Sequence, residues 1–409
     1  MLLLAEKPTL NLNPTVYKII GESAFTYLAR AKALAEKGMD IVSFGIGQPD
    51  LPTPKHIREA AKRALDEGFT GYTETAGIAP LREMIAWYLN SRYNADVKKD
   101  EIVVATGAKT AIFMGIAAFV RPGDEVIIPE PSYPLYAQVV KLFGGKPIFV
   151  PLSWYGPDKG FHLNIELLES KVSSKTRMIV INNPHNPTGA VFAPNEIDDL
   201  YSLAMRKKVV ILADEVYDNF VYSGVNFKSI LSEPEWRDYV VYVNGFSKTF
   251  AMTGWRLGYI VARSEIIDRF IDLAVNIYSC AVSFAQKAAV TALKGSWEPV
   301  KEMVTLFEKR RNLLYELLSD VPGFEVWRSP GTFYMFPKVT EALELLGIKT
   351  SKELADLLLE RYGVVVLPGT AFPDKAGEGF IRFSFSVNLD KIREGVSRIK
   401  RAIEELSRR

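Results

Sequence analysis

The sequence predicts an α/β fold in which a mostly parallel sheet lies between helices. Short apolar runs alternate along the chain with longer segments whose apolar residues recur at helical spacing. Polar residues that could bind a ligand come directly after several of these runs, as in the loops beyond the carboxyl ends of the strands of an open α/β sheet. With 409 residues the chain can form one large domain and a smaller one, each with its own core.

The composition is that of an ordinary soluble globular protein, with 48% hydrophobic and 24% charged residues. Fifty basic and 48 acidic residues leave a net charge of +2, which gives no reason to expect nucleic acid or an anionic membrane as a partner. No run approaches the roughly 20 apolar residues of a membrane span, and the apolar start at 1–5 is too short for a signal peptide. No Cys/His spacing indicates a metal site.

The single cysteine, Cys280, excludes an intrachain disulfide and fits a reducing compartment. We expect it to be a small buried hydrophobic residue. The sequence therefore predicts a cytoplasmic protein.

The elements are expected in a βα order after an N-terminal arm at 10–17. Helices are predicted at 23–37, 54–65, 110–120 and over most of 265–320, where the charges of 300–318 should form a solvated face. Strands of the larger region are predicted at 101–105, 125–128, 146–152, 177–181, 209–213, 239–243 and 259–262. Shorter strands are predicted at 324–327, 331–336, 364–369 and 379–386.

A lysine follows the apolar run 239–243. Lys248 lies among Phe246, Phe250 and Trp255, and desolvation there would lower the pKa of its amine. A neutral amine can attack a carbonyl and hold it as a Schiff base. Another buried run, 209–213, ends in Asp214, whose charge needs a cationic partner because an unpaired buried charge is costly.

A tight turn follows the strand at 101–105 and precedes a helix. Its residues, Gly107, Ala108 and Lys109, would present backbone N–H groups to an anion. The spacing of a nucleotide-binding P-loop is absent, so the turn predicts a phosphate that need not belong to a nucleotide.

Several motifs occur in a fixed order around these residues. They are Gly45-Ile46-Gly47-Gln48-Pro49-Asp50, the segment Gly71-Tyr72 to Leu81-Arg82, the rigid loop Pro129 to Tyr136, Asn183-Pro184-His185-Asn186-Pro187-Thr188-Gly189, Asp214 to Tyr217, Ser247-Lys248 with Arg256, and Ile381-Arg382-Phe383-Ser384. Together they resemble the class I/II aminotransferases, enzymes of fold type I that use pyridoxal phosphate (PLP). The resemblance extends from about Val42 to Ser386.

This resemblance implies an architecture. The large domain, 45–295, would hold a mostly parallel seven-stranded sheet and bind PLP. The N-terminal arm and helix, 1–44, would join 296–409 in a smaller α/β domain built from both chain ends. Members of the family are homodimers with active sites at the interface.

The resemblance also implies roles for individual residues. Lys248 would be the catalytic residue that holds PLP. The other cofactor-binding residues would be Asp214 at the ring nitrogen, Asn186 and Tyr217 at the ring oxygen, Tyr133 on the ring face, Gly107, Ala108, Lys109, Ser247 and Arg256 at the phosphate, and Tyr72 at the phosphate in the neighbouring subunit. Substrate would meet Gly47, Asn186 and Arg382, the last at its α-carboxylate. One phosphate-binding hydroxyl of the family is missing at Gly245.

The implied activity is the transfer of an amino group from an L-amino acid, best guessed as aspartate, to 2-oxoglutarate by a ping-pong mechanism. Alanine or an aromatic amino acid remains an alternative donor, and a PLP-dependent lyase would use the same residues. A cofactor-sensing module and an unrelated phosphate-binding protein are more distant alternatives. Lys109 is a candidate for a second substrate carboxylate, and segments 15–21 and 278–284 are expected to decide the substrate. His185 and Glu215 are expected to serve structure.

Overall fold

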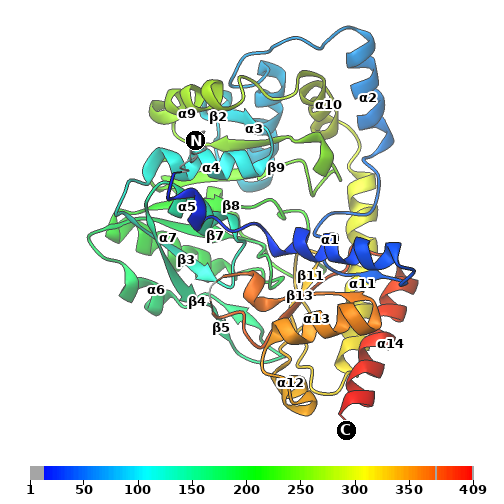
Figure 1. Cartoon of the computed structure of the whole chain (residues 1–409). Coiled ribbons are helices and arrows are strands. Elements are labelled where there is room, and N and C mark those ends of the chain that lie inside the picture. Colours follow the sequence, from blue (N-terminus) through cyan, green and yellow to red (C-terminus); the bar gives the residue numbers. More distant parts are fainter. Residues whose placement is uncertain (1–12, 374, 408–409) are drawn as a thin grey trace, which may run out of the picture.

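The computed structural model describes residues 13–373 and 375–407, and its central feature is a seven-stranded sheet (Figure 1). The strands lie in the order β2-β10-β9-β8-β7-β3-β4, and all neighbours are parallel except those of β10. Their bounds are β2 Ile102–Ala105, β3 Glu125–Glu130, β4 Lys146–Pro151, β7 Thr176–Asn182, β8 Val210–Asp214, β9 Val240–Gly245 and β10 Gly258–Val261. The predicted α/β fold with a mostly parallel sheet is therefore confirmed.

Helices cover both faces of this sheet. Successive residues of a strand point to opposite faces, so in β8 Leu212 packs in one core while Ile211 and Ala213 pack in the other. The core of Leu212 includes side chains of α4 Ala108–Phe119, α5 Leu135–Leu142 and α9 Ser264–Ile277. The core of Ile211 includes side chains of α2 Lys55–Asp66, α3 Ala79–Tyr93, α6 Ile165–Lys171, α7 Pro194–Lys207, α8 Trp236–Tyr239 and α10 Ser283–Lys294. These almost continuously apolar strands are buried on both sides, as expected for a parallel sheet.

A second group of elements combines both ends of the described chain. Strand β1 Val42–Ser43 pairs in parallel with β12 Val364–Val365, and α1 Ser23–Glu36 contacts β12. Strands β11 Tyr334–Met335, β14 Ile381–Ser384 and β13 Leu367–Pro368 form a small antiparallel sheet. These contacts support our proposal that 1–44 and 296–409 form a small domain beside 45–295, although residues 1–12 lie outside the described part.

The long helix α11 Glu298–Ser319, yellow in Figure 1, runs from the large sheet region toward the red C-terminal helix α14 Leu389–Leu406. The remaining elements are helices α12 Thr340–Leu346 and α13 Ser351–Tyr362, strands β5 Ser153–Trp154 and β6 Phe161–His162, and the 3-10 turns Val16–Lys18, Lys99–Glu101, Ile230–Ser232, Thr253–Trp255 and Gly369–Ala371. Among the described residues no helix is both long and apolar enough to cross a membrane.

Three expectations from the sequence are wrong. Residues 324–327 form no strand and contribute only an isolated bridge between Glu325 and Lys338. The charges of α11 are not all solvated, because Arg310 is buried and donates to both carboxylate oxygens of Asp50 at 2.7 and 2.9 Å. Cys280 is only partly buried, so it is not the fully buried residue that we expected. Of the predicted arm at 10–17, residues 10–12 lie outside the described part and 13–17 form a turn.

Candidate active site

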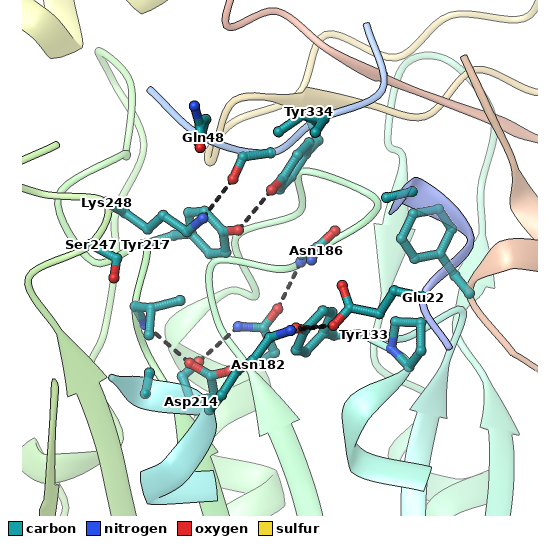
Figure 2. A pocket seen from close by; sticks show the side chains of 18 of the residues that line it. Glu22, Gln48, Tyr133, Asn182, Asn186, Asp214, Tyr217, Ser247, Lys248 and Tyr334 are labelled. Carbon is teal, nitrogen blue, oxygen red and sulfur yellow. Dashed lines mark hydrogen bonds and ion pairs between the residues drawn. The ribbon is translucent and has the colours of Figure 1, made fainter. Parts of the chain in front are cut away.

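A cavity of about 280 Å³ lies beyond the carboxyl ends of β7, β8 and β9 (Figure 2). This is close to the lower end of the range of small-molecule sites, roughly 300 Å³. The predicted site residues that line it are Gly47, Ala108, Lys109, Tyr133, Asn186, Asp214, Tyr217, Ser247, Lys248, Arg256 and Arg382. Gly107 lies just outside the lining and contacts Arg256, whereas Tyr72 is 91% exposed and does not reach the cavity of its own chain.

Lys248 follows β9 and extends its amine into the cavity. Its Nζ donates to the carbonyl oxygen of Gly47 at 2.6 Å and lies 5.7 and 5.6 Å from the ring centroids of Tyr217 and Phe333. Burial, and next the positive charge of Arg382, lower the pKa of this amine to about 8. The prediction that Phe246 and Phe250 surround this amine was partly wrong, because these two side chains stack on each other in the core.

Asp214 ends β8 at the inner wall of the cavity. The hydroxyl of Tyr136 donates to its Oδ2 at 2.7 Å, and the backbone N–H of Val216 donates to Oδ1 at 3.3 Å. Burial nevertheless raises the pKa of this carboxyl to about 6. The cost of burying its charge would fall if a cation of a bound molecule lay against it.

The loop after β7 is fixed to the end of β8 through Asn182. Its amide donates to the backbone oxygen of Asp214 at 2.9 Å and accepts from the backbone N–H of Asn186 at 2.7 Å. Adjacent parallel strands bring these positions together, since Asn182 and Asp214 are partners in the register. The amide of Asn186 is thereby held at the cavity wall.

Arg382 lies on β14 and is 4% exposed. Its Nη1 donates to Oδ1 of Asn186 at 2.9 Å and its Nη2 donates to the carbonyl oxygen of Gly45 at 2.7 Å. Its buried Nε has no hydrogen-bond partner among the described residues. A buried donor of this kind in a cavity wall can bind a carboxylate.

Two tyrosines close the cavity beside the lysine. The hydroxyls of Tyr217 and Tyr334 lie 2.8 Å apart, and the two side chains point toward each other in Figure 2. The loop at Gly47 passes so close to Tyr334 that a Cβ there would lie 1.9 Å from its hydroxyl oxygen. Glycine at this position is therefore required by close packing.

The predicted anion-binding turn has the geometry of a cradle. Gly107 has φ +92° and immediately precedes α4, and a Cβ on it would lie 2.4 Å from Nη2 of Arg256. The N-terminus of α4 and the guanidinium of Arg256 therefore converge here, with Ser247 also in the lining. A Cβ on Gly245 would lie 3.1 Å from the carbonyl oxygen of Leu257, so the close packing of β9 and β10 leaves little room for the family's hydroxyl.

PLP fits this set of residues. It would bring a phosphate to the Gly107 cradle, a cationic ring nitrogen to the buried carboxyl of Asp214, and a carbonyl carbon to the amine of Lys248. These groups match three features of the protein: a glycine cradle with a guanidinium, a buried acid that forms no ion pair with the described residues, and a desolvated amine.

Two neighbouring titratable groups serve structure, as expected. Glu215 accepts from the Ser229 hydroxyl at 2.6 Å and from the Ile230 N–H at 2.9 Å, and burial raises its pKa to about 8. His185 lies 2.7 Å from the hydroxyl of Thr188, and burial lowers its pKa to about 3. Neither side chain lines the cavity.

Four of the cavity-lining residues that sequence reasoning missed carry polar side chains that matter for the site. They are Glu22, Tyr136, Asn182 and Tyr334. Tyr136 could have been found as the aromatic residue one helical turn beyond Tyr133, and Asn182 as the last residue of a buried strand. Glu22 and Tyr334 carry no local signal, because only the fold brings them to the cavity.

The cavity thus has the chemistry of a PLP-dependent enzyme that acts on a carboxylate-bearing substrate. The chain belongs to the aminotransferase class I and II family, whose model matches residues 39–399, and it is a PLP-dependent transaminase.

The chain is 51% identical to an aspartate aminotransferase of Sulfurisphaera tokodaii over 95% of this chain and 96% of that protein. The solved structure of the aspartate aminotransferase from Rhizobium meliloti matches with a TM-score of 0.91 and 32% identity, covering 97% of this chain and 100% of that one. An aromatic aminotransferase from Pyrococcus horikoshii OT3 matches with a TM-score of 0.85 and 39% identity, covering 92% and 99%.

Proposed function

We propose that the chain transfers the amino group of L-aspartate to 2-oxoglutarate, forming oxaloacetate and L-glutamate. The observation that most directly supports this function is the presence of the Lys248 amine, the Arg382 guanidinium and the Lys109 ammonium in one cavity. A dicarboxylic amino acid needs one cation for each carboxylate, and the charges of Arg382 and Lys109 both act on the Lys248 amine by lowering its pKa. The similarity to aspartate aminotransferases agrees with this substrate.

The bound PLP supplies an electron-withdrawing ring that stabilises negative charge at the substrate α-carbon. In our proposal Asp214 would keep the ring nitrogen protonated, and Asn186 and Tyr217 would donate to the ring oxygen. Tyr133 would pack against the ring. Arg256, Ser247 and the N–H groups of the turn Gly107–Lys109 would hold the phosphate.

Lys248 has two tasks in this proposal. Its amine would link the protein to PLP, and with substrate bound it would act as the general base that accepts the α-proton. A pKa of about 8 suits both tasks, because a substantial fraction of the amine is then neutral near physiological pH. The carbonyl oxygen of Gly47, 2.6 Å from Nζ, helps to orient the amine.

Arg382 binds the α-carboxylate of the substrate. Its side chain is already fixed by Asn186 and by Gly45, so little side-chain entropy remains to be lost on binding.

Lys109 binds the second carboxylate. Its ammonium lies 5.7 Å from the ring centroid of Tyr133, next to the expected position of the cofactor ring. Lys248, Arg256 and Arg382 have other tasks in this proposal, so among the described residues Lys109 is the cavity-lining cation that remains for the substrate side chain.

We expect Lys109→Met to lower kcat/KM for aspartate by about 10- to 150-fold, since a hydrogen bond to a charged group contributes about 1.5–3 kcal/mol. Methionine keeps the length and helix propensity of lysine but removes the charge. Steady-state kinetics with phenylalanine provide the control, because its side chain has no carboxylate and its kcat/KM should change little. Equal losses for both donors would contradict the assignment.

The reaction itself is tested by its products. Protein supplied with PLP, aspartate and 2-oxoglutarate should form oxaloacetate and glutamate in equal amounts, measured by chromatography. Aspartate consumption without matching glutamate would instead support the lyase alternative.

We further propose a homodimer in which Tyr72 reaches the phosphate in the neighbouring site. In a single chain this side chain is 91% exposed and has no role in its own cavity. Light scattering should give the mass of two chains, and Tyr72→Phe should weaken PLP binding by about 10-fold or more. The matched control is Tyr155→Phe, another exposed tyrosine at 61%, which should leave PLP affinity unchanged. A monomer, or equal PLP affinity in both variants, would refute this proposal.

We also propose a cytoplasmic location, because one cysteine suits a reducing compartment. Cell fractionation followed by immunodetection tests it, and recovery outside the cytoplasmic fraction would contradict it.

A further inference from the structure

Glu22 places a carboxylate of the protein itself inside the cavity. It is the residue before α1, and its side chain is 23% exposed. It accepts a hydrogen bond from the hydroxyl of Tyr133 at 2.8 Å, and both residues are labelled in Figure 2. It also forms an ion pair with Lys109. The negative charge of Glu22 also acts on Arg382. Burial lowers the pKa of this guanidinium, and the charge of Glu22 raises it.

Helix formation does not explain this position. The side chain of Glu22 accepts no capping hydrogen bond from the backbone of α1. The preceding 3-10 turn Val16–Lys18 has no buried residue, and its connection to Glu22 is fixed by a hydrogen bond from the N–H of Ile20 to Gln138 at 3.0 Å. A segment with so few buried contacts can move at little cost.

Glu22 is paired with the ammonium of Lys109, the cation that a dicarboxylic substrate needs for its second carboxylate. Two carboxylates cannot share Lys109 without repulsion, so aspartate must displace Glu22 from the ammonium. An aromatic side chain has no such requirement. While Glu22 remains, the charge of Lys109 is compensated and the nearby wall is largely apolar, with Phe25, Tyr133 and Phe372 in the lining.

We propose that Glu22 is a specificity-determining residue, an internal carboxylate that is exchanged for the side-chain carboxylate of a dicarboxylic substrate. In its inward position the cavity accepts uncharged, aromatic side chains, and in its displaced position it accepts dicarboxylates. One cavity can thereby serve both substrates of a ping-pong reaction when only one of them carries a second carboxylate. This inference rests on the proposed role of Lys109.

The test uses the PLP-loaded protein and two ligands that cannot donate an amino group, succinate and 3-phenylpropanoate. Their dissociation constants are measured by calorimetry for the wild type, Glu22→Gln, Lys109→Met and the double variant. We expect Glu22→Gln to raise the affinity for succinate relative to 3-phenylpropanoate by about 5-fold, the upper value for a part-exposed ion pair. In the Lys109→Met background the same substitution should leave this ratio unchanged.

Glu36→Gln is the matched control, because it makes the same charge change at the other end of α1, on a side chain that is 67% exposed. The inference would be overturned if Glu22→Gln left the ratio of the two affinities unchanged although Lys109→Met loses affinity for succinate. If Lys109→Met binds succinate as the wild type does, the proposed role of Lys109 fails first, and the inference fails with it.

Discussion

Lys248→Ala is expected to lower kcat for amino transfer by at least about 10⁴-fold, the upper value for the contribution of a general acid–base residue. The variant loses the covalent link to PLP and also the amine that moves the α-proton. PLP should still bind, because the Gly107 turn, Arg256 and Asp214 do not depend on the lysine. Steady-state kinetics measure the loss of kcat. Borohydride reduction followed by mass spectrometry measures the loss of the covalent link, since only the wild type should retain PLP on Lys248.

Lys248→Arg is the control for charge. Arginine keeps a cation in the cavity, but its guanidinium remains protonated and can neither form the covalent link nor accept the α-proton. It should therefore be as inactive as the alanine variant. Activity in either variant within 10-fold of the wild type would refute the assignment of Lys248.

Asp214→Asn is expected to lower kcat/KM by about 10²- to 10⁴-fold, because loss of a buried ionic partner costs about 3–5 kcal/mol. Asparagine has nearly the same shape and can still accept the hydrogen bond that Tyr136 now makes at 2.7 Å, so the fold should be retained. What it lacks is the negative charge that would keep the PLP ring nitrogen protonated. Kinetics and the PLP dissociation constant should both report the change.

Glu215→Gln is the matched control for this substitution. Its side chain is as buried as that of Asp214, but it hydrogen-bonds Ser229 and Ile230 outside the cavity. With a pKa raised to about 8 it is largely protonated near neutral pH, so a neutral amide should leave activity near the wild-type value. Equal losses in both variants would show that Asp214 acts through the fold rather than through its charge.

The large sheet could be predicted because its strands are local patterns. The apolar runs 209–213 and 239–243 are each followed by polar residues, and these two runs form neighbouring parallel strands with Asp214 and Lys248 at the same edge. An amine or an acid just beyond a buried strand can be recognised as a candidate site residue from the local sequence, without knowledge of distant residues. Most candidate residues of the cavity followed from this logic and from the family motifs.

The rest could not be predicted because it depends on contacts between distant parts of the chain. Tyr334 contacts Tyr217 and Gly47 only because β11, which pairs with β14 in the small sheet, carries it to the cavity. Arg310 was assigned to solvent because its partner, Asp50, lies far away in sequence. Glu22 precedes α1, and its approach to Lys109 depends on how the start of this helix lies against the cavity.

The near-ultraviolet and visible absorption spectrum of the purified PLP-loaded protein tests the central claim, amino transfer through Lys248, most directly. We predict a visible band of lysine-bound PLP that aspartate removes, with a near-ultraviolet band of the amino form of the cofactor in its place. Addition of 2-oxoglutarate should restore the visible band. A protein that remains colourless after incubation with PLP, or a band that no amino acid removes, would contradict the proposed reaction.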